Sequence, residues 1–266
     1  MATRRGLFWA GLSLAVPMLR PLQPAQAAEP SLSSLIHEAD HVLRGKTTAA
    51  LLDMHIHTKS YDRSYAMVYW GDEQGGHNRT LIKIVGPARW RGHGTLKVDG
   101  RLSLYDPSSD RVTVLSSSMV GDNWMGSHFT NDDLVRETEL ARDYRARELR
   151  RWQGEVAGKS ATFYRVWLDP TPQAPVAWNH LVLEFYSQSG AVIPTREEYF
   201  RRAQQAAPTR VMTFSEVKPM AERDVPTRLR IEVAAQPGEF TELTYKTLRF
   251  DAAVPASKFT EQALRR

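Results

Sequence analysis

The chain contains no cysteine, and this absence removes several kinds of chemistry. Without thiols there are no disulfide bonds, no thiolate metal sites and no cysteine nucleophile. No cysteine is present to carry an acyl group either, so we expect a protein that is not itself a lipoprotein. The fold must then be held by its apolar core and its polar contacts alone.

Beyond the N-terminal region, the chain also lacks any apolar run long enough to cross a bilayer. The start of the chain is different: Arg4-Arg5 precedes an apolar run, and Ala25-Gln26-Ala27 offers the small residues of a cleavage site. This order is typical of an export signal, so we expect residues 1–27 to be cleaved and residues 28–266 to form one periplasmic domain. The paired arginines leave both the general and the twin-arginine export route open.

The chain also lacks a large net charge. The net charge of the whole chain is +5, but the expected signal contributes three arginines and no acids, which leaves about +2 for the remainder. A chain so close to neutral has no overall electrostatic attraction for nucleic acid. We therefore expect no nucleic-acid partner.

What the sequence does contain is alternation. Residues 32–43 place apolar side chains on one helix face, and then the pattern changes to period two, which is typical of strands. The expected strands cover 52–56, 65–69, 80–85, 93–98, 101–105, 111–116, 145–152, 162–168, 181–186, 195–202, 210–216, 229–233 and 242–250. About eleven or more strands with few helices predict a mainly β (α+β) domain, with one curved antiparallel sheet or half barrel. Both strand faces carry apolar residues, so a sandwich core would explain the pattern nearly as well.

One central stretch, from Trp124 to Leu134, joins large apolar side chains to the start of a helix expected over 131–144. Thr130 and Asp133 have the spacing of a capping box, in which each residue satisfies the other's backbone amide. An apolar loop fixed to a capped helix predicts a lid over an apolar ligand.

Residues with catalytic potential do not form a recognisable site. His55 and His57 share a strand face, but no third metal ligand is near in sequence, so we expect exposed histidines and no metal. Ser127 and His128 are adjacent, a spacing that rarely presents a nucleophile to its base. Asp133, with its neighbour Asp132, is better explained by helix capping. The sequence predicts a protein that is not an enzyme and needs no cofactor.

Several stretches resemble the outer-membrane lipoprotein-sorting protein family, the relatives of the periplasmic carrier LolA. Residues 36–45 are similar to its opening helix, which ends in Arg-Gly, and residues 124–134 are similar to its Met-Gly-Ser-Asp-Phe-Thr/Ser motif, which ends in Asp-Leu. Residues 192–200, 225–228 and 250–264 resemble its later strands and tail. His128 stands where the family often has aspartate, so a contact of that aspartate would here be lost or depend on pH.

The resemblance implies a half barrel with a helical lid over a hydrophobic cavity, which carries acyl chains of lipoproteins or other lipids without covalent chemistry. It also implies a monomer that meets an inner-membrane transporter of the RND type or a lipoprotein-release machinery. The residues expected to line the cavity or lid are Trp124, Met125, Phe129, Leu134, Trp70, Trp90, Tyr105 and Trp167. Two alternatives remain: an accessory subunit that docks on the transporter without cargo and, further behind, a hydrolase using Ser127 and His128.

Overall fold

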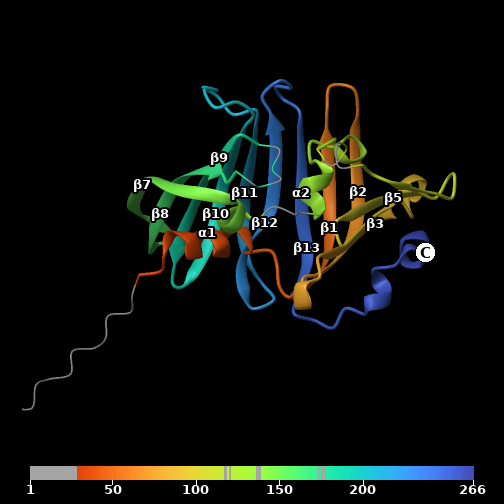
Figure 1. Cartoon of the computed structure of the whole chain (residues 1–266). Helices are drawn as coiled ribbons and strands as arrows, with labels where there is room; N and C mark the ends of the chain where they lie inside the picture. Colours follow the sequence, from red (N-terminus) through yellow and green to blue (C-terminus); the bar gives the residue numbers. More distant parts are fainter. Residues whose placement is uncertain are drawn as a thin grey trace, which may run out of the picture. The chain divides into compact units, whose positions relative to one another are not determined.

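A computed structural model describes residues 29–266, except 117, 118, 120, 136–138, 173, 175 and 177. The expected export signal at 1–27 lies outside these residues. Ser31–Arg266 forms one compact unit. Its main feature is a curved antiparallel sheet of thirteen strands (Figure 1). The predicted mainly β class and the curved open sheet are confirmed, and the thirteen strands agree with the expectation of about eleven or more.

The strands follow the chain outward along one half of the sheet and inward along the other. Their order is β6-β5-β4-β3-β2-β1-β13-β12-β11-β10-β9-β8-β7, so the first strand pairs with the last. The bounds are β1 Thr47–His57, β2 Asp62–Asp72, β3 Arg79–Gly86, β4 Gly94–Val98, β5 Arg101–Asp106, β6 Arg111–Val114, β7 Tyr144–Val156, β8 Lys159–Pro170, β9 His180–Gln188, β10 Ala191–Phe200, β11 Arg210–Met220, β12 Arg223–Val233 and β13 Phe240–Phe250. All thirteen lie on or around segments that alternate in the sequence.

Alternation places side chains on two faces, which differ in their cover. On β1, Met54 and Ile56 are fully buried, whereas His55 and His57 point the other way, with their side chains 41% and 46% exposed. We call the face that carries Met54 the inner face and the face that carries His55 the outer face. The main apolar core lies on the inner face, which helices cover. Of the two arrangements that the sequence left open, the structure therefore has the single sheet covered by helices and not the sandwich.

Short helices cover the inner face. Helix α1 (Leu32–Asp40) begins at Ser31, whose Oγ accepts a hydrogen bond from the Ser34 amide at 3.1 Å. The segment between β6 and β7, which we call the lid, carries η4 (Trp124–Gly126), α2 (Asn131–Val135) and α3 (Leu140–Asp143). Figure 1 shows α1 and α2 in front of the sheet.

The single helix expected over 131–144 is wrong, because the chain forms two separate helices there. Glu139 has an extended backbone (φ −114°, ψ 117°) before α3 begins, and its amide donates to Asp143 Oδ2 at 2.9 Å. This side-chain contact provides a second helix start, since Asp143 satisfies an amide that an unbroken helix would bond internally. Residues 136–138, between the two helices, lie outside the described part of the chain.

The C-terminal residues cover part of the outer face. After η5 (Ala256–Lys258), helix α4 (Glu261–Arg265) packs its Leu264 with Phe259 against Leu81, Leu96 and Tyr105 in a second apolar cluster. The short turns η1 (Gln74–Gly76) and η2 (Ala88–Trp90) link strands. None of the helices in the described part of the chain is both long and apolar enough to cross a membrane.

Candidate binding site beneath the lid

A narrow apolar cavity lies between the inner face, α1 and the lid. Its volume is about 90 Å³, whereas ligand pockets commonly enclose about 300–1,000 Å³. Its lining is mostly apolar and includes flexible methionines: Val42, Leu43, Leu52, Met67, Tyr69, Ile82, Phe129, Leu134, Met212, Phe214, Leu229, Leu243 and Tyr245. The lining therefore suits an apolar ligand, but the space in this state is too small for a long one.

The start of the lid is fixed by a tight turn and a buried tryptophan. Met125 and Gly126 both have positive φ values, 48° and 78°, and an added Cβ on Gly126 would lie 2.8 Å from the Tyr61 hydroxyl. The turn directs Trp124 into the core, where it is 1% exposed and its Nε1 donates to Thr95 Oγ1 at 2.8 Å. The Met-Gly pair of the motif is thus explained by backbone geometry, since glycine tolerates positive φ without strain.

His128 attaches the lid to the start of β13. Its backbone amide donates to Thr241 Oγ1 at 2.9 Å, and its ring Nδ1 lies 2.8 Å from the same oxygen. The ring is 3% exposed, and its Nε2 is 4.0 Å from Glu239. Burial lowers the pKa of His128, although the Glu239 carboxylate opposes this. A neutral His128 ring accepts a hydrogen bond from the Thr241 hydroxyl at Nδ1. This contact between the lid and β13 therefore depends on the charge of the histidine.

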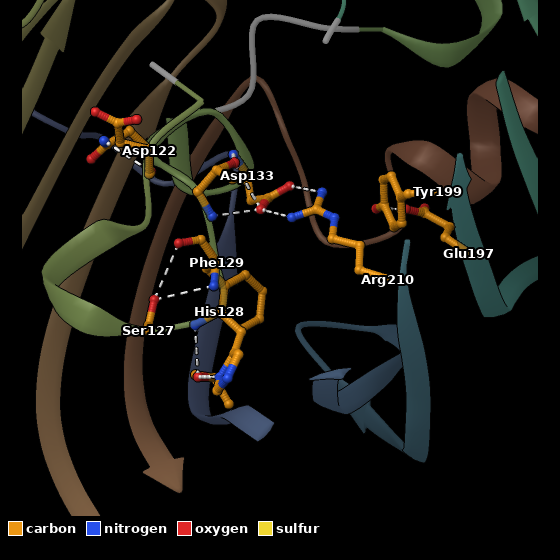
Figure 2. A network of polar contacts seen from close by, with 11 residues as sticks. Asp122, Ser127, His128, Phe129, Asp133, Glu197, Tyr199 and Arg210 are labelled. Carbon is orange, nitrogen blue, oxygen red and sulfur yellow. Dashed lines mark hydrogen bonds and ion pairs between the residues drawn. The ribbon is translucent and has the colours of Figure 1, made fainter. Parts of the chain in front are cut away.

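The predicted capping box is confirmed and has an additional role. Thr130 and Asp133 exchange hydrogen bonds, with the Thr130 amide 2.7 Å from Asp133 Oδ2 and the Asp133 amide 3.1 Å from Thr130 Oγ1. The same carboxylate forms a two-point ion pair with Arg210 on β11, at 2.5 and 2.6 Å (Figure 2). Burial alone would raise the pKa of Asp133, but the Arg210 guanidinium and the Thr130 contacts hold it below its usual range.

Arg210 is buried among aromatic and acidic groups. Its guanidinium carbon lies 4.0 Å from the centre of the Tyr199 ring and 4.7 Å from that of Trp178. The Tyr199 hydroxyl donates to Glu197, which Figure 2 shows beside Arg210. A smaller cavity, lined in part by Asp40 and Tyr144, lies next to this group. The polar network therefore lies between the two cavities, whose linings share Asp40, Asp133 and Glu197. The sequence alone did not indicate it.

Polar residues also line the larger cavity: Asp40, Arg44, Thr48, Glu73, Asp133 and Glu197. Arg44, from the Arg-Gly that follows α1, lines the cavity together with Glu73, and the two side chains are 3.6 Å apart. The other guanidinium nitrogen, Nη2, is buried and has no hydrogen-bond partner among the described residues. A buried donor without a partner is costly, so this nitrogen is suited to receive an acceptor from a ligand.

The structure divides the eight residues expected at the cavity or lid. Phe129 and Leu134 line the cavity. Trp124, Met125 and Trp90 pack in or against the same core without lining it, with Trp90 edge-on to Tyr65. Trp124 and Phe129 are 1% and 2% exposed, so these two side chains of the lid face the core and not the solvent.

The other three expected residues lie on the outer face. Trp70 and Tyr105 belong to the cluster beneath the C-terminal helix, and Trp167 stacks on His180 with ring centres 4.0 Å apart. The reason is the two-residue period of a strand, by which neighbours point to opposite faces. On β2 it is Tyr69, the residue before Trp70, that lines the cavity.

Neither Ser127 with His128 nor His55 with His57 forms a catalytic or metal site among the described residues. Ser127 Oγ is hydrogen-bonded to the backbone of Phe129, and His128 is bonded to Thr241 instead of to the serine. His55 and His57 both contact Asp62, at 2.8 and 3.0 Å, on the exposed outer face. No group of three or more potential metal ligands occurs in the part of the chain that the structure describes.

Comparisons with known proteins concern the family and the fold of this chain. A family model described as an uncharacterized protein matches residues 76–266. No curated protein matches the chain. A structure described as an outer membrane lipoprotein-sorting protein domain, from Vibrio parahaemolyticus, is 21% identical, with 83% of this chain and 92% of that chain covered and a TM-score of 0.68.

Two further solved structures are similar over nearly their whole length. A DUF1329 family protein from Desulfovibrio piger is 18% identical, covers 87% of this chain and 97% of its own, and has a TM-score of 0.73. A LolA superfamily protein from Nitrosomonas europaea is also 18% identical, with coverages of 88% and 100% and a TM-score of 0.67. At these identities the likeness concerns the fold. The chain belongs to the family of uncharacterized proteins whose model spans residues 76–266, and its fold is LolA-like.

Proposed function

We propose that this protein is a non-catalytic carrier that binds acyl chains of lipoproteins or other lipids between its inner face and its lid. The observation that carries this proposal is the cavity, which is apolar throughout most of its lining and is roofed by a separate segment. Each buried methylene contributes about 0.8 kcal/mol, so such a lining can hold an acyl chain without any covalent step.

Because the cavity is small, a carrier with this structure has to open before it binds an acyl chain. A space of about 90 Å³ cannot enclose a long acyl chain, so binding requires the lid to move away from the inner face. The lid is attached to the sheet by a few polar contacts, at Thr95, Thr241 and Arg210. Methionine side chains such as Met67 and Met212 can then adapt to the chain that enters.

The place of action follows from the expected export signal and from the nature of the cargo. A carrier for acyl chains is needed where a lipid must cross water, and an exported carrier meets this need between the inner and outer membranes. We propose that it receives cargo from an inner-membrane transporter of the RND type or a lipoprotein-release machinery and passes it toward the outer membrane. The alternative, an accessory subunit that docks through the apolar loop, has less support because Trp124 and Phe129 are buried.

The first test is native mass spectrometry of the protein purified from the periplasm without detergent, followed by lipid extraction. We expect a bound species with the mass of a lipid. Binding of fatty acids of increasing chain length is then measured with two variants on neighbouring residues of β11. Met212 lines the cavity, whereas Val211 points to the outer face and is half-buried.

Met212→Phe should narrow the cavity without adding a polar group, so the affinity for the longest chains should fall by about tenfold if two methylenes lose their burial. Val211→Phe should leave chain-length preference unchanged. Equal effects of the two variants, or no binding of any acyl chain by the intact protein, would contradict a cargo site beneath the lid.

A further inference from the structure

A second, larger groove lies on the outer face, between β2 and β3 and the C-terminal residues. Its volume is about 650 Å³. Val68, Trp70, Leu81 and Ile84 supply an apolar part of its lining, and η5 and α4 supply the opposite wall. The groove is therefore separated by the sheet from the cavity beneath the lid, which is lined by the other face of the same strands.

The charged side chains of this groove all have one sign. Its lining includes Lys83, Arg91, Lys258 and Arg266, and contains no aspartate or glutamate side chain. None of these four cations forms a side-chain ion pair with any residue that the structure describes. Some cations elsewhere on the outer face are paired, as in Lys246 with Asp53 at 3.1 Å. A group of unpaired cations in a concave site favours an anion.

Lys83 shows that this arrangement is not merely a solvated surface. The residue is 9% exposed, and its Nζ donates to the Ala263 carbonyl at 3.4 Å, its one hydrogen bond within the described chain. Burial and the positive charge of Lys258 together lower the pKa of Lys83. Two ammonium groups thus act on each other without a carboxylate between them, and an anion in the groove would relieve both the repulsion and the desolvation.

The apolar lining restricts the kind of anion. The Lys258 ammonium lies 4.5 Å from the centre of the Trp70 ring, which links the cationic and apolar parts of the groove. An inorganic anion would use the charges alone, and an acidic protein segment would leave the apolar lining without a partner. A molecule with a phosphate at one end and an apolar body matches both parts.

We propose that the groove binds an anionic phospholipid, whose phosphate is held by Lys83 and Lys258 while its apolar part lies along Trp70. This would be a second lipid site, on the opposite side of the sheet from the carrier cavity. It places the C-terminal residues in contact with lipid and requires no movement of the lid.

The test uses the whole mature protein and a soluble short-chain lipid, dihexanoyl phosphatidylglycerol, below its micelle concentration. The signal is the NMR resonance of the Trp70 indole N–H, assigned by its loss in Trp70→Phe. We expect this resonance to shift on titration with the lipid, and dihexanoyl phosphatidylcholine, which lacks net charge, to bind more weakly. Inorganic phosphate and a short polyglutamate peptide are titrated separately to distinguish the source of the anion.

The groove variant is Lys83→Gln/Lys258→Gln, and its matched control is Lys59→Gln/Lys159→Gln, which removes two exposed lysines outside the groove. We expect the groove variant to weaken lipid binding by about tenfold or more, and the control to change it little. Lys258→Gln alone, at a more accessible position, provides a second variant that should weaken binding while the buried Lys83 keeps its place.

Three results would overturn the proposal. Equal binding of the two lipids would show that charge is not recognised, and equal binding by the groove and control variants would place the lipid elsewhere. A Trp70 response to phosphate or polyglutamate at lower concentration than to the lipid would show that the apolar part of the groove is not used for lipid.

Discussion

Asp133 on the lid and Arg210 on β11 are 77 residues apart in the chain and form a two-point ion pair that closes the lid onto the sheet. Side-chain exposure is 10% for Asp133 and 4% for Arg210. A buried pair of this kind contributes less to stability than its geometry suggests, because both charges must first leave water. Its larger effect is to fix the position of the lid on the sheet, because any position that separates the two partners leaves a buried charge without its counter-charge.

Arg210→Met should therefore lower the free energy of unfolding by about 3–5 kcal/mol, because it leaves the Asp133 carboxylate buried and unpaired. The double variant Arg210→Met/Asp133→Leu should recover much of this loss, since it removes both charges. Urea unfolding of Arg210→Met, of Asp133→Leu and of the double variant provides a double-mutant cycle. Additive losses would show that the two residues act independently.

An exposed pair serves as the control for this cycle. Arg230 and Glu232 on β12 lie 3.0 Å apart, with their side chains 37% and 52% exposed. Removal of either should change stability by at most about 1 kcal/mol, because water screens the pair.

Trp124 should act as a structural anchor of the lid. Trp124→Ala should cost about 3–5 kcal/mol through the cavity it leaves, and Trp124→Phe about 1–3 kcal/mol because Thr95 Oγ1 loses its buried partner. Thermal or urea unfolding measures both. Trp152→Phe on the outer face, where the ring stacks on Phe163, is the control. A loss at Trp124 no larger than at Trp152 would contradict the anchoring role.

Stability should depend on pH through His128. Burial lowers its pKa from the usual 6.5, so protons bind the unfolded chain more tightly than the folded one. The histidine's contribution is complete above about pH 6.5 and is lost as the pH falls toward the folded-state pKa.

His128→Gln should therefore lose less stability than the parent protein between about pH 7.5 and pH 5, measured by urea unfolding at each pH. His77→Gln, at an exposed position, should keep the parent's dependence. A parent-like pH dependence in His128→Gln would show that this ring does not titrate with unfolding.

Arg44 should select the headgroup of the cargo if the carrier function is correct. Because its buried Nη2 lacks a partner, Arg44→Met should weaken binding of dodecanoate more than binding of dodecanol. Glu73→Gln should have the opposite effect on dodecanoate, since it removes the carboxylate 3.6 Å from Arg44. Competition with a fluorescent fatty acid measures the affinity of each of the two variants for dodecanoate and for dodecanol. Equal losses for acid and alcohol would assign Arg44 a structural role alone.

The features that the sequence predicted are those that depend on neighbours in the chain. The strands follow from alternation, and the Thr130–Asp133 capping box from a spacing of three residues. The exposure of His55 follows from its place between the apolar residues Met54 and Ile56. Each of these requires contacts of short range, which the order of residues determines directly.

Only the tertiary structure decided whether an apolar side chain on a strand lies under the lid or under the C-terminal helix. Trp70 and Tyr69 are adjacent and both aromatic, so alternation separates them but cannot say which side the lid covers and which side the C-terminal helix covers. The pairing of Arg210 with Asp133 likewise joins residues far apart in the chain, and no local pattern marks it. The cavity, the outer groove and the position of the lid all depend on such long-range packing, and for this reason they appear only in the folded molecule.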